Sequence, residues 1–385
     1  MSYVVVGAGG VGKSLMFDVW RDEPDARFLA IDPSVATLAD LKTRAEGKNL
    51  ECLNLDASNV SDLANAIAGA SVVANCTDGA RSLDILDAAI AAGVNYVDVH
   101  GTLLVNERFE RSEAAKNAGI TALIGMGCSP GITNMLGAYG ARQMSGEISI
   151  DVEYYTRRQL NPSWGLLETA LRQFRDHARS PVYENGKITE HKPFEGTKVT
   201  SFPSIDDPVE LVYTPHSEPY TIPRFVPGLK RVTVRGSYSA EMMALLKSLY
   251  RFGLLDPERS VSVDGKQVDF QPLLREALFA GGEARVGETD PRYILRVIVT
   301  AEEEGRFMQS ETTLGHDAGW HPLPQANLTA LPTAYSVRLL GSGRFRSPGV
   351  CGPELFAPED VEGCLSHLKS RGVWVHTVRK EWNKT

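Results

Sequence analysis

The stretch Tyr3-Val4-Val5-Val6-Gly7-Ala8-Gly9-Gly10-Val11-Gly12 opens the chain and decides its fold. A short β-branched run leads into a glycine-rich turn, and apolar residues at the spacing of a helix face follow. In such a strand–turn–helix unit the glycines allow a tight turn, close approach of the backbone to a pyrophosphate, and close packing of helix on strand. We therefore expect a dinucleotide to bind at Gly7, Gly9, Gly10, Val11 and Gly12, with its phosphates at the helix N-terminus.

A second predicted strand, residues 27–31, ends at Asp32. Asp32 follows the last glycine by about 20 residues, the spacing of the carboxylate that hydrogen-bonds a ribose 2′-hydroxyl. The next residues, Pro33 and Ser34, offer no arginine for a 2′-phosphate, so NAD is expected rather than NADP. The alternative is that Asp32 only forms a turn before the proline.

Four further strands, 50–55, 71–76, 96–99 and 120–124, alternate with Ala-rich helical segments. This alternation predicts an α/β fold with a doubly wound, Rossmann-type parallel sheet as an NAD-binding domain over residues 1–130. Ligands bind such sheets at the carboxyl ends of the strands. The loops that follow those ends supply the remaining cofactor candidates, which are Asp56, Ala57, Cys76, Thr77, Asp78, Gly127 and Cys128.

From about residue 148 the pattern changes to long alternating strands joined by Gly-containing turns such as Asn185-Gly186 and Asp264-Gly265. We expect a second, α+β domain over residues 131–325, built on an open and mostly antiparallel sheet and used for substrate binding and dimerisation. Residues 326–385 are expected to return to the nucleotide domain.

Composition excludes several classes of protein. The chain has 385 residues and a net charge of -8, and it has no long basic run, so nucleic acid and membrane partners are not expected. No apolar stretch reaches the roughly 18 residues of a membrane span, and a cytoplasmic location is expected. The 5 cysteines form no C-x-x-C pair, so we expect free thiols and no metal.

Several motifs carry a family resemblance over most of the chain. Besides the glycine-rich turn, they are Tyr96-Val97-Asp98, the stretch 127–134 (GCSPGITN), Asn185-Gly186-Lys187, Pro227-Gly228-Leu229-Lys230, Thr333-Ala334-Tyr335 and the stretch 349–354 (GVCGPE). With these motifs the chain resembles the saccharopine dehydrogenase-like oxidoreductases, and most closely their lysine 6-dehydrogenase branch.

The resemblance implies hydride transfer between the cofactor and an amine carbon of a small amino-acid substrate. Oxidative deamination of lysine at its terminal amine is the leading hypothesis, with a homo-oligomer, either a dimer or a tetramer, as the assembly. One alternative is a saccharopine-type or opine-type dehydrogenase, which forms or cleaves a secondary amine between an amino acid and a keto acid. A further alternative is a non-catalytic NAD-binding regulator.

Amine oxidation needs a neutral amine, and so a base beside the nicotinamide. Asp98 and His100 follow the fifth strand and are the acid–base candidates, His100 because an imidazole titrates near neutrality. The alternative for Asp98 is a turn-capping role. The cluster after residue 215 predicts that Glu218 binds an ammonium and Arg224 a carboxylate, unless it is an exposed polar loop. The other substrate-binding candidates are Ser163, Trp164 and His216.

Overall fold

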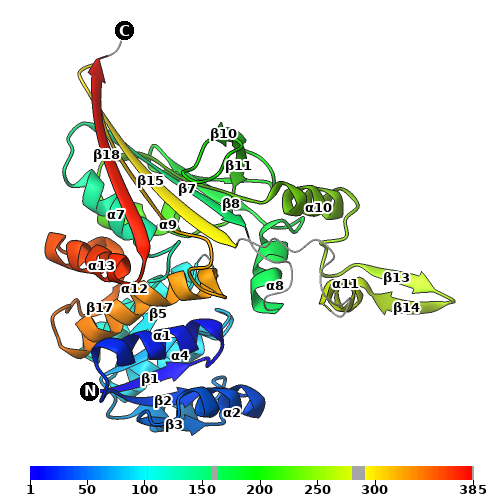
Figure 1. The fold of residues 1–385 in the computed structure, drawn as a ribbon, viewed down its shortest axis with the longest axis vertical. Helices are drawn as coiled ribbons and strands as arrows, with labels where there is room; N and C mark the ends of the chain where they lie inside the picture. The colour runs from blue at the N-terminus through cyan, green and yellow to red at the C-terminus, as the bar shows by residue number, and fades with distance from the viewer. Residues whose placement is uncertain (102, 158–163, 280–290, 384–385) are drawn as a thin grey trace. The chain divides into compact units, whose positions relative to one another are not determined.

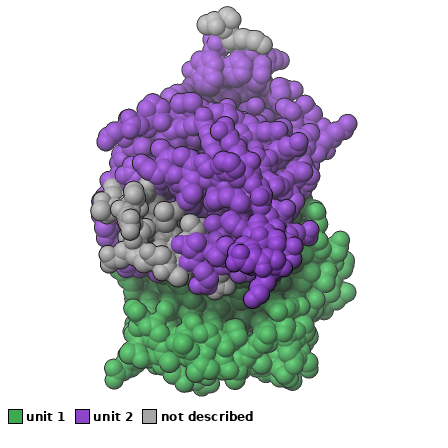
Figure 2. Space-filling view, turned by 90° about the vertical axis from the view of Figure 1, so that its right-hand side faces the viewer, with its two compact units in different colours: residues 1–143, 224–226, 325–372 green, residues 144–223, 227–324, 373–385 purple. Residues whose placement is uncertain are grey.

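The computed structural model describes residues 1–101, 103–157, 164–279 and 291–383 (Figure 1). The chain forms two compact units, which Figure 2 colours separately. Unit 1 comprises 1–143, 224–226 and 325–372, and unit 2 comprises 144–223, 227–324 and 373–385. Unit 1 thus extends past the expected boundary at residue 130, and the C-terminal residues from 373 on belong to unit 2 rather than to the nucleotide domain.

Unit 1 is built on a seven-stranded sheet in the order β17-β6-β5-β4-β1-β2-β3, with every neighbouring pair parallel. Its strands are β1 (Ser2–Val6), β2 (Arg27–Ile31), β3 (Leu50–Leu53), β4 (Val72–Asn75), β5 (Asn95–Asp98), β6 (Thr121–Leu123) and β17 (Gly349–Cys351). The strand order reverses beside β1, between β4 and β2, and the carboxyl ends of β1 and β4 therefore form the ligand-binding edge of such a sheet. The predicted doubly wound α/β fold is confirmed.

Strand β17 was not predicted. It has three residues, and it lies in a segment so rich in Gly and Pro that the sequence indicates only a loop. Val350 pairs with Ala122 of β6, so the late segment adds a strand to a sheet whose other strands all precede residue 124. Only the tertiary pairing makes these residues a strand.

Two helices of unit 1, α2 (Val35–Arg44) and α3 (Val60–Ile67), begin at side-chain caps. Ser34 caps α2 by accepting the Thr37 N–H at 3.2 Å, and Asn59 caps α3 through the Asp62 N–H at 3.2 Å. The apolar residues of α1, such as Leu15, Met16 and Val19, are fully buried. The helices are α1 (Gly10–Asp22), α2 (Val35–Arg44), α3 (Val60–Ile67), α4 (Ser82–Ala92), α5 (Val105–Glu110), α6 (Ser112–Asn117), α7 (Ile132–Ala141), α12 (Pro324–Gly341), the 3-10 turn η1 (Pro353–Leu355) and α13 (Pro358–Ser370).

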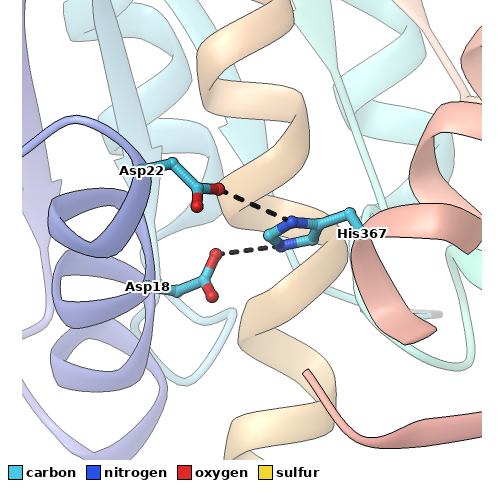
Figure 3. Close-up of side chains that lie close together, drawn as sticks. All are labelled: Asp18, Asp22 and His367. Carbon is cyan, nitrogen blue, oxygen red and sulfur yellow. Dashed lines mark ion pairs between the residues drawn. The ribbon is translucent and has the colours of Figure 1, made fainter. Parts of the chain in front are cut away.

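A network of charged side chains ties α1 to the late helices of unit 1. Figure 3 shows the carboxylates of Asp18 and Asp22 pointing at the ring of His367, whose Nε2 lies 2.9 Å from Asp18. Arg371 also pairs with both carboxylates, at 2.6 and 2.7 Å, and Arg338 pairs with Asp22. Although Asp18, Asp22 and His367 are close enough to hold a metal ion, two guanidinium groups already neutralise these carboxylates, and we interpret the group as an ion-pair network.

Unit 2 contains a mixed nine-stranded sheet in which seven strands run in the order β10-β11-β12-β7-β15-β16-β18. Strands β8 and β9 extend it from β12, and β12 with β7 is the parallel pair. The expected open, mostly antiparallel sheet is confirmed. Its strands are β7 (Glu147–Arg157), β8 (Ser180–Glu184), β9 (Lys187–His191), β10 (Lys198–Thr200), β11 (Val209–Tyr213), β12 (Leu229–Tyr238), β15 (Arg292–Glu303), β16 (Arg306–His316) and β18 (Val373–Asn383).

The turns of unit 2 follow their sequence signals. Asn185 and Gly186 both have positive φ angles, 49° and 82°, as the tight β8–β9 hairpin requires. Asp264 and Gly265 do the same between β13 (Ser260–Val263) and β14 (Lys266–Asp269). The register of each hairpin is therefore set locally.

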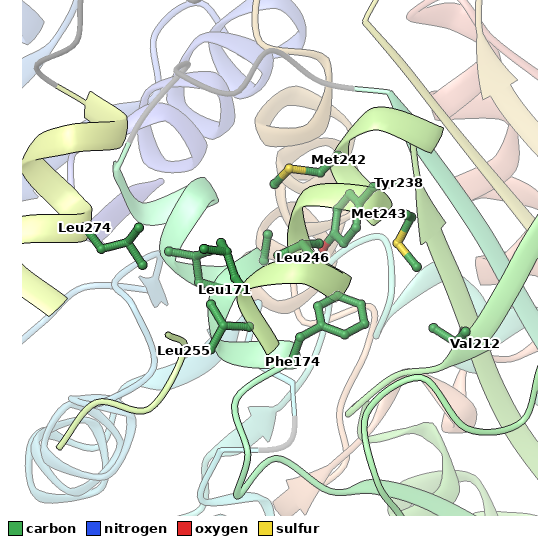
Figure 4. Close-up of a cluster of buried hydrophobic side chains, with 11 residues drawn as sticks. Leu171, Phe174, Val212, Tyr238, Met242, Met243, Leu246, Leu255 and Leu274 are labelled. Carbon is green, nitrogen blue, oxygen red and sulfur yellow. The ribbon is translucent and has the colours of Figure 1, made fainter. Parts of the chain in front are cut away.

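The helices of unit 2 are α8 (Trp164–Gln173), α9 (Glu218–Phe225), α10 (Ala240–Arg251) and α11 (Phe270–Phe279). Figure 4 shows how Leu171 and Phe174 of the α8 region meet Leu246 of α10 and Leu274 of α11 in one apolar cluster. Helix α9 was not predicted, because two prolines and few apolar residues hide its periodicity. Among the described residues, no helix combines the length and the apolar character needed to span a membrane.

Candidate functional site

The glycine-rich turn lies between β1 and α1, and its glycines are required for different reasons. Gly7 has a φ of 94°, and a Cβ there would lie 2.8 Å from the Cys76 carbonyl. A Cβ at Gly12 would overlap the Gly7 carbonyl oxygen, so this glycine lets the helix pack on the turn. A Cβ at Gly9, by contrast, would meet nothing within 4 Å. The turn therefore leaves open space where a pyrophosphate approaches, and Gly10 and Val11 begin the helix whose N–H groups face it.

Asp32 lies directly after β2 and its carboxylate reaches the turn. Oδ2 accepts the Ala8 N–H at 2.9 Å, and Oδ1 accepts the Ser34 N–H at 2.8 Å. These two bonds use half of the acceptor sites of a carboxylate, which leaves sites for ribose hydroxyls. Asn54, after β3, donates to the Asp32 and Pro33 carbonyls at 3.1 and 2.8 Å and so holds this corner. The turn and Asp32 together fit a dinucleotide.

Asp56 and Ala57 follow β3 at the same edge of the sheet. The exposed Asp56 carboxylate accepts the Ser58 N–H at 2.9 Å, which lowers its pKa, and the Ala57 side chain is buried. The residues lie where a parallel sheet binds the adenine end of a dinucleotide, and their contact with it stays a prediction.

The loop after β4 faces the glycine-rich turn. A Cβ at Gly7 would lie 2.9 Å from the Thr77 nitrogen, so Thr77 is next to the turn. Burial, with the nearby Asp98 charge, raises the pKa of Cys76 to about 12, and this cysteine is therefore not a nucleophile. Asp78 is exposed and caps its own loop through the Ala80 N–H at 3.0 Å.

Asp98 ends β5 and is completely buried. Both of its oxygens accept hydrogen bonds from Arg108 Nη1, at 2.9 and 2.8 Å, and its other donors are Tyr96 Oη at 2.9 Å, Gly125 N at 2.7 Å and His100 N at 3.1 Å. Burial opposes ionisation, but Arg108, His100 and the Gly125 N–H outweigh it, so the pKa of Asp98 lies below its ordinary value. The expectation that Asp98 is an acid–base group is corrected, because every part of this carboxylate is bound and no substrate can reach it.

His100 lies two residues beyond Asp98, with 7% of its surface exposed. Burial is the main cause that lowers its pKa to about 4, against the raising effect of the Asp98 charge. The ring is thus neutral near pH 7, and among the described residues its Nε2 atom has no hydrogen-bond partner. A Cβ at Gly79 would lie 3.3 Å from Nδ1, which places the ring against the loop after β4. Because this site lowers the near-neutral pKa for which His100 was chosen, His100 stays an acid–base candidate on its position at the end of β5 alone.

The loop after β6 is held by helix α12, which comes later in the chain. Cys128 is buried, and its Sγ lies 3.2 Å from Thr329 Oγ1 of α12, while Thr333 donates to the Met126 carbonyl at 2.7 Å. A Cβ at Gly127 would lie 3.2 Å from the Thr329 methyl group. Any larger residue at position 127 would therefore require its neighbours to shift. Cys128 packs against α12 here, and its contact with the cofactor stays a prediction.

Two of the expected substrate residues lie in a polar cluster of unit 2. His216 Nδ1 is 3.5 Å from Glu218 Oε2, and both side chains are buried. The Tyr154 ring lies 5.2 Å from the His216 ring and over Gly236, where a side chain would overlap it. Tyr154 is a residue that sequence reasoning missed, since one tyrosine in a strand carries no signal of its own.

Arg224 does not share a ligand with Glu218. The six-residue separation places the two on different faces of α9. Arg224 is exposed, donates to Asn106 Oδ1 at 2.7 Å and lies 4.5 Å over the Phe109 ring. The expectation that the two residues hold opposite ends of one amino acid is corrected. Ser163 and the side chain of Trp164 lie outside the described residues.

Sequence reasoning also gave no role to three buried residues of unit 1, namely Asn75, Tyr96 and Arg108. Asn75 accepts from Thr77 Oγ1 at 2.8 Å and donates to Tyr96 Oη at 3.0 Å, and Tyr96 donates to Asp98. A polar residue inside an apolar strand is the signal that could have found the first two, while Arg108 resembles any helical arginine in the sequence.

Comparisons with known proteins agree with this architecture. The family model of the saccharopine dehydrogenase NADP binding domain matches residues 3–123, and that of the saccharopine dehydrogenase C-terminal domain matches residues 127–373. The chain belongs to the saccharopine dehydrogenase family. It thus contains an NAD(P)-binding domain.

A curated protein resembles this chain in sequence, and a solved structure resembles it in fold. A carboxyaminopropylagmatine dehydrogenase of Synechocystis is 26% identical over 265 residues, which are 65% of this chain and 66% of that protein, just under two thirds of its length. The apo structure of saccharopine dehydrogenase (L-Glu forming) from Saccharomyces cerevisiae has the same fold, with a TM-score of 0.70 at 15% identity, over 98% of this chain and 99% of that one.

Proposed function

We propose that this saccharopine dehydrogenase family member is an NAD-dependent dehydrogenase that forms or cleaves the C–N bond of a secondary amine derived from an amino acid. The observation that carries the proposal is the match of both family models, which together span nearly the whole chain. The similarity to a carboxyaminopropylagmatine dehydrogenase favours this substrate class over lysine. Oxidative deamination of lysine at its terminal amine is the second candidate, and it rests on the resemblance of the sequence motifs.

The residues that would hold the cofactor fit it. Gly7, Gly9 and Gly12 shape the turn for the pyrophosphate, and Asp32 would bind the ribose hydroxyls. When bound, the nicotinamide supplies an acceptor for the hydride of the carbon that carries nitrogen. Asp32 supports NAD as the cofactor, because a carboxylate repels a 2′-phosphate, although the family model bears the name of an NADP binding domain.

His100 is the group that would accept the amine proton. A protonated amine cannot release hydride, so the nitrogen must first lose a proton to a neutral base. The Nε2 atom of His100 would be that base, because the ring is neutral near pH 7, although its pKa of about 4 makes it a weaker base than an ordinary imidazole. Water then adds to the iminium carbon and the C–N bond breaks to give a carbonyl compound and a free amine.

The polar cluster around His216 and Glu218 would bind the cationic part of the substrate. A buried carboxylate recognises an ammonium or guanidinium group by a charge-assisted hydrogen bond, and the Tyr154 ring beside it adds an aromatic face. Glu218→Gln should therefore raise KM for a cationic substrate and leave KM for NAD within about twofold. A homo-oligomer remains a further prediction, which light scattering on the purified protein tests.

The first experiment measures NADH formation with the purified protein, NAD and three substrates in turn, which are saccharopine, carboxyaminopropylagmatine and lysine. Turnover of either secondary amine, with none on lysine, supports the proposal. Turnover of free lysine alone overturns the secondary-amine proposal in favour of terminal deamination. Tight NAD binding without turnover of any amine, in either direction, would instead favour the non-catalytic regulator.

A further inference from the structure

A fully buried ion pair lies beneath the loops that end β4, β5 and β6. Arg108, on α5, has no exposed surface, and neither does its partner Asp98. Burying two charges costs several kcal/mol, and hydrophobic residues in their place often give equal or greater stability. Stability alone therefore does not explain why an arginine and an aspartate occupy this position.

The geometry of Arg108 suggests what the pair does. Nη1 of Arg108 donates to both Asp98 oxygens, while Nη2 donates to the Gly101 carbonyl at 2.7 Å and to the Leu103 carbonyl at 3.3 Å. One planar guanidinium thus joins the end of β5 to the segment that follows His100. A lysine would keep the positive charge. It could not donate in fixed directions both to Asp98 and to the two carbonyls, because only the guanidinium group is planar and preorganised.

Asp98 also connects β5 to its two neighbouring strands, β4 and β6. It accepts from the His100 N–H and from the Gly125 N–H after β6, and Tyr96 links it to Asn75 and Thr77 after β4. The loops after β4, β5 and β6 are therefore all linked by hydrogen bonds to Asp98, the first of them through Tyr96 and Asn75. The charged groups that act on the His100 ring are Asp98 of β5, Arg108 of α5 and Asp78 of the loop after β4.

We propose that Arg108 and Asp98 act together as a positioning pair that fixes the His100 ring for proton transfer. The proposal rests on the proposed function, in which His100 takes the amine proton. Neither member touches substrate. Arg108 sets the geometry of the ring and also cancels the Asp98 charge, so that the ring stays neutral over the working pH range.

Two substitutions separate geometry from charge. In Arg108→Lys the charge remains and the fork is lost, so we expect kcat to fall by about tenfold or more, with KM for NAD within about twofold and the acid limb of the pH–rate profile in place. In Arg108→Gln the Asp98 charge is uncompensated, so that limb should move up by about one pH unit or more. Arg111→Lys and Arg111→Gln, at a half-exposed arginine in the next turn, are the matched controls and should match the wild type.

Tyr96→Phe keeps the proposal testable if the Arg108 variants fail to fold, because it removes one hydroxyl that donates to Asp98 and changes little volume. We expect it to lower kcat by several-fold with NAD affinity intact. Folded Arg108 variants with wild-type kcat and an unmoved pH profile would overturn the proposal. So would Tyr96→Phe at wild-type kcat, should no Arg108 variant fold.

An NMR titration of the His100 ring separates this inference from the function. The ring of Arg108→Gln should titrate at least about one pH unit higher than that of the wild type, whether or not any amine is a substrate. If no amine is turned over but this shift appears, the proposed function fails and the coupling of the pair to His100 stands. If amines are oxidised and the ring titrates alike in both proteins, the inference fails and the function stands.

Discussion

At the scale of single residues, Asp32 shows how one carboxylate serves structure and selectivity together. It holds the glycine-rich turn through Ala8 and keeps acceptor sites for a ribose. Asp32→Asn retains an acceptor and removes the charge. We expect NAD to bind roughly ten- to a hundredfold more weakly and NADP to be nearly unaffected, since a charge-assisted hydrogen bond contributes about 1.5–3 kcal/mol. Titration of each dinucleotide by protein fluorescence measures this, and equal losses for the two would contradict the role of Asp32.

His100 also predicts how stability depends on pH. Its pKa is about 4 in the folded protein and about 6.5 in the unfolded chain. Between these two pH values the unfolded state binds a proton that the folded state does not bind. Stability therefore falls as the pH drops from 6.5 towards 4, by roughly 3 kcal/mol at most from this residue. In His100→Gln that contribution disappears. Urea unfolding at pH 7.5 and pH 5 should show a smaller loss in the variant than in the wild type, and an equal loss would show that His100 titrates normally.

At the scale of elements, two glycines of the β1–turn–α1 unit have different roles. Gly12 is needed for folding, and Gly9 is expected to be needed for NAD binding. Gly12→Ala sets a methyl group on the Gly7 carbonyl oxygen, so we expect a loss of about 1–3 kcal/mol in the free energy of unfolding. Gly9→Ala places its methyl in open space, where only a bound pyrophosphate would meet it. It should unfold almost like the wild type and bind NAD at least about tenfold more weakly. The reverse pattern, measured by denaturant unfolding and NAD titration, would place the pyrophosphate elsewhere.

At the scale of the whole molecule, unit 1 is assembled from segments far apart in the chain. Residues 325–372 complete the unit that begins at Met1, and the Asp18–His367–Arg371 network joins the two parts. Arg371→Met removes the guanidinium from the buried Asp18 carboxylate and leaves it His367 as a partner, so we expect a loss of about 1.5–3 kcal/mol in the free energy of unfolding. Lys369→Met changes an exposed lysine in the last turn of α13, two residues before Arg371, and should cost less than about 0.5 kcal/mol. Equal effects of the two changes would show that the network contributes no stability.

The sequence by itself determined the elements whose signals are local. The glycine-rich turn, the spacing to Asp32, the alternation of strands and helices, and the hairpin turns all depend on neighbours within about twenty residues. Each of them predicts structure directly. His100 was nominated in the same way, because a parallel sheet presents the ends of its strands at one edge, and its role as a base stays a prediction.

Only the tertiary structure decided the features that depend on distant segments. Strand β17 becomes a strand by pairing with β6, and residues from 373 on join the sheet of unit 2 by pairing with β16. Asp98 changed from an acid–base candidate to one half of an ion pair because Arg108, ten residues later, reaches it in the interior. Burial and ion pairing decide whether a carboxylate can exchange protons with a substrate or only holds other residues in place. Neither property can be read from the order of the residues.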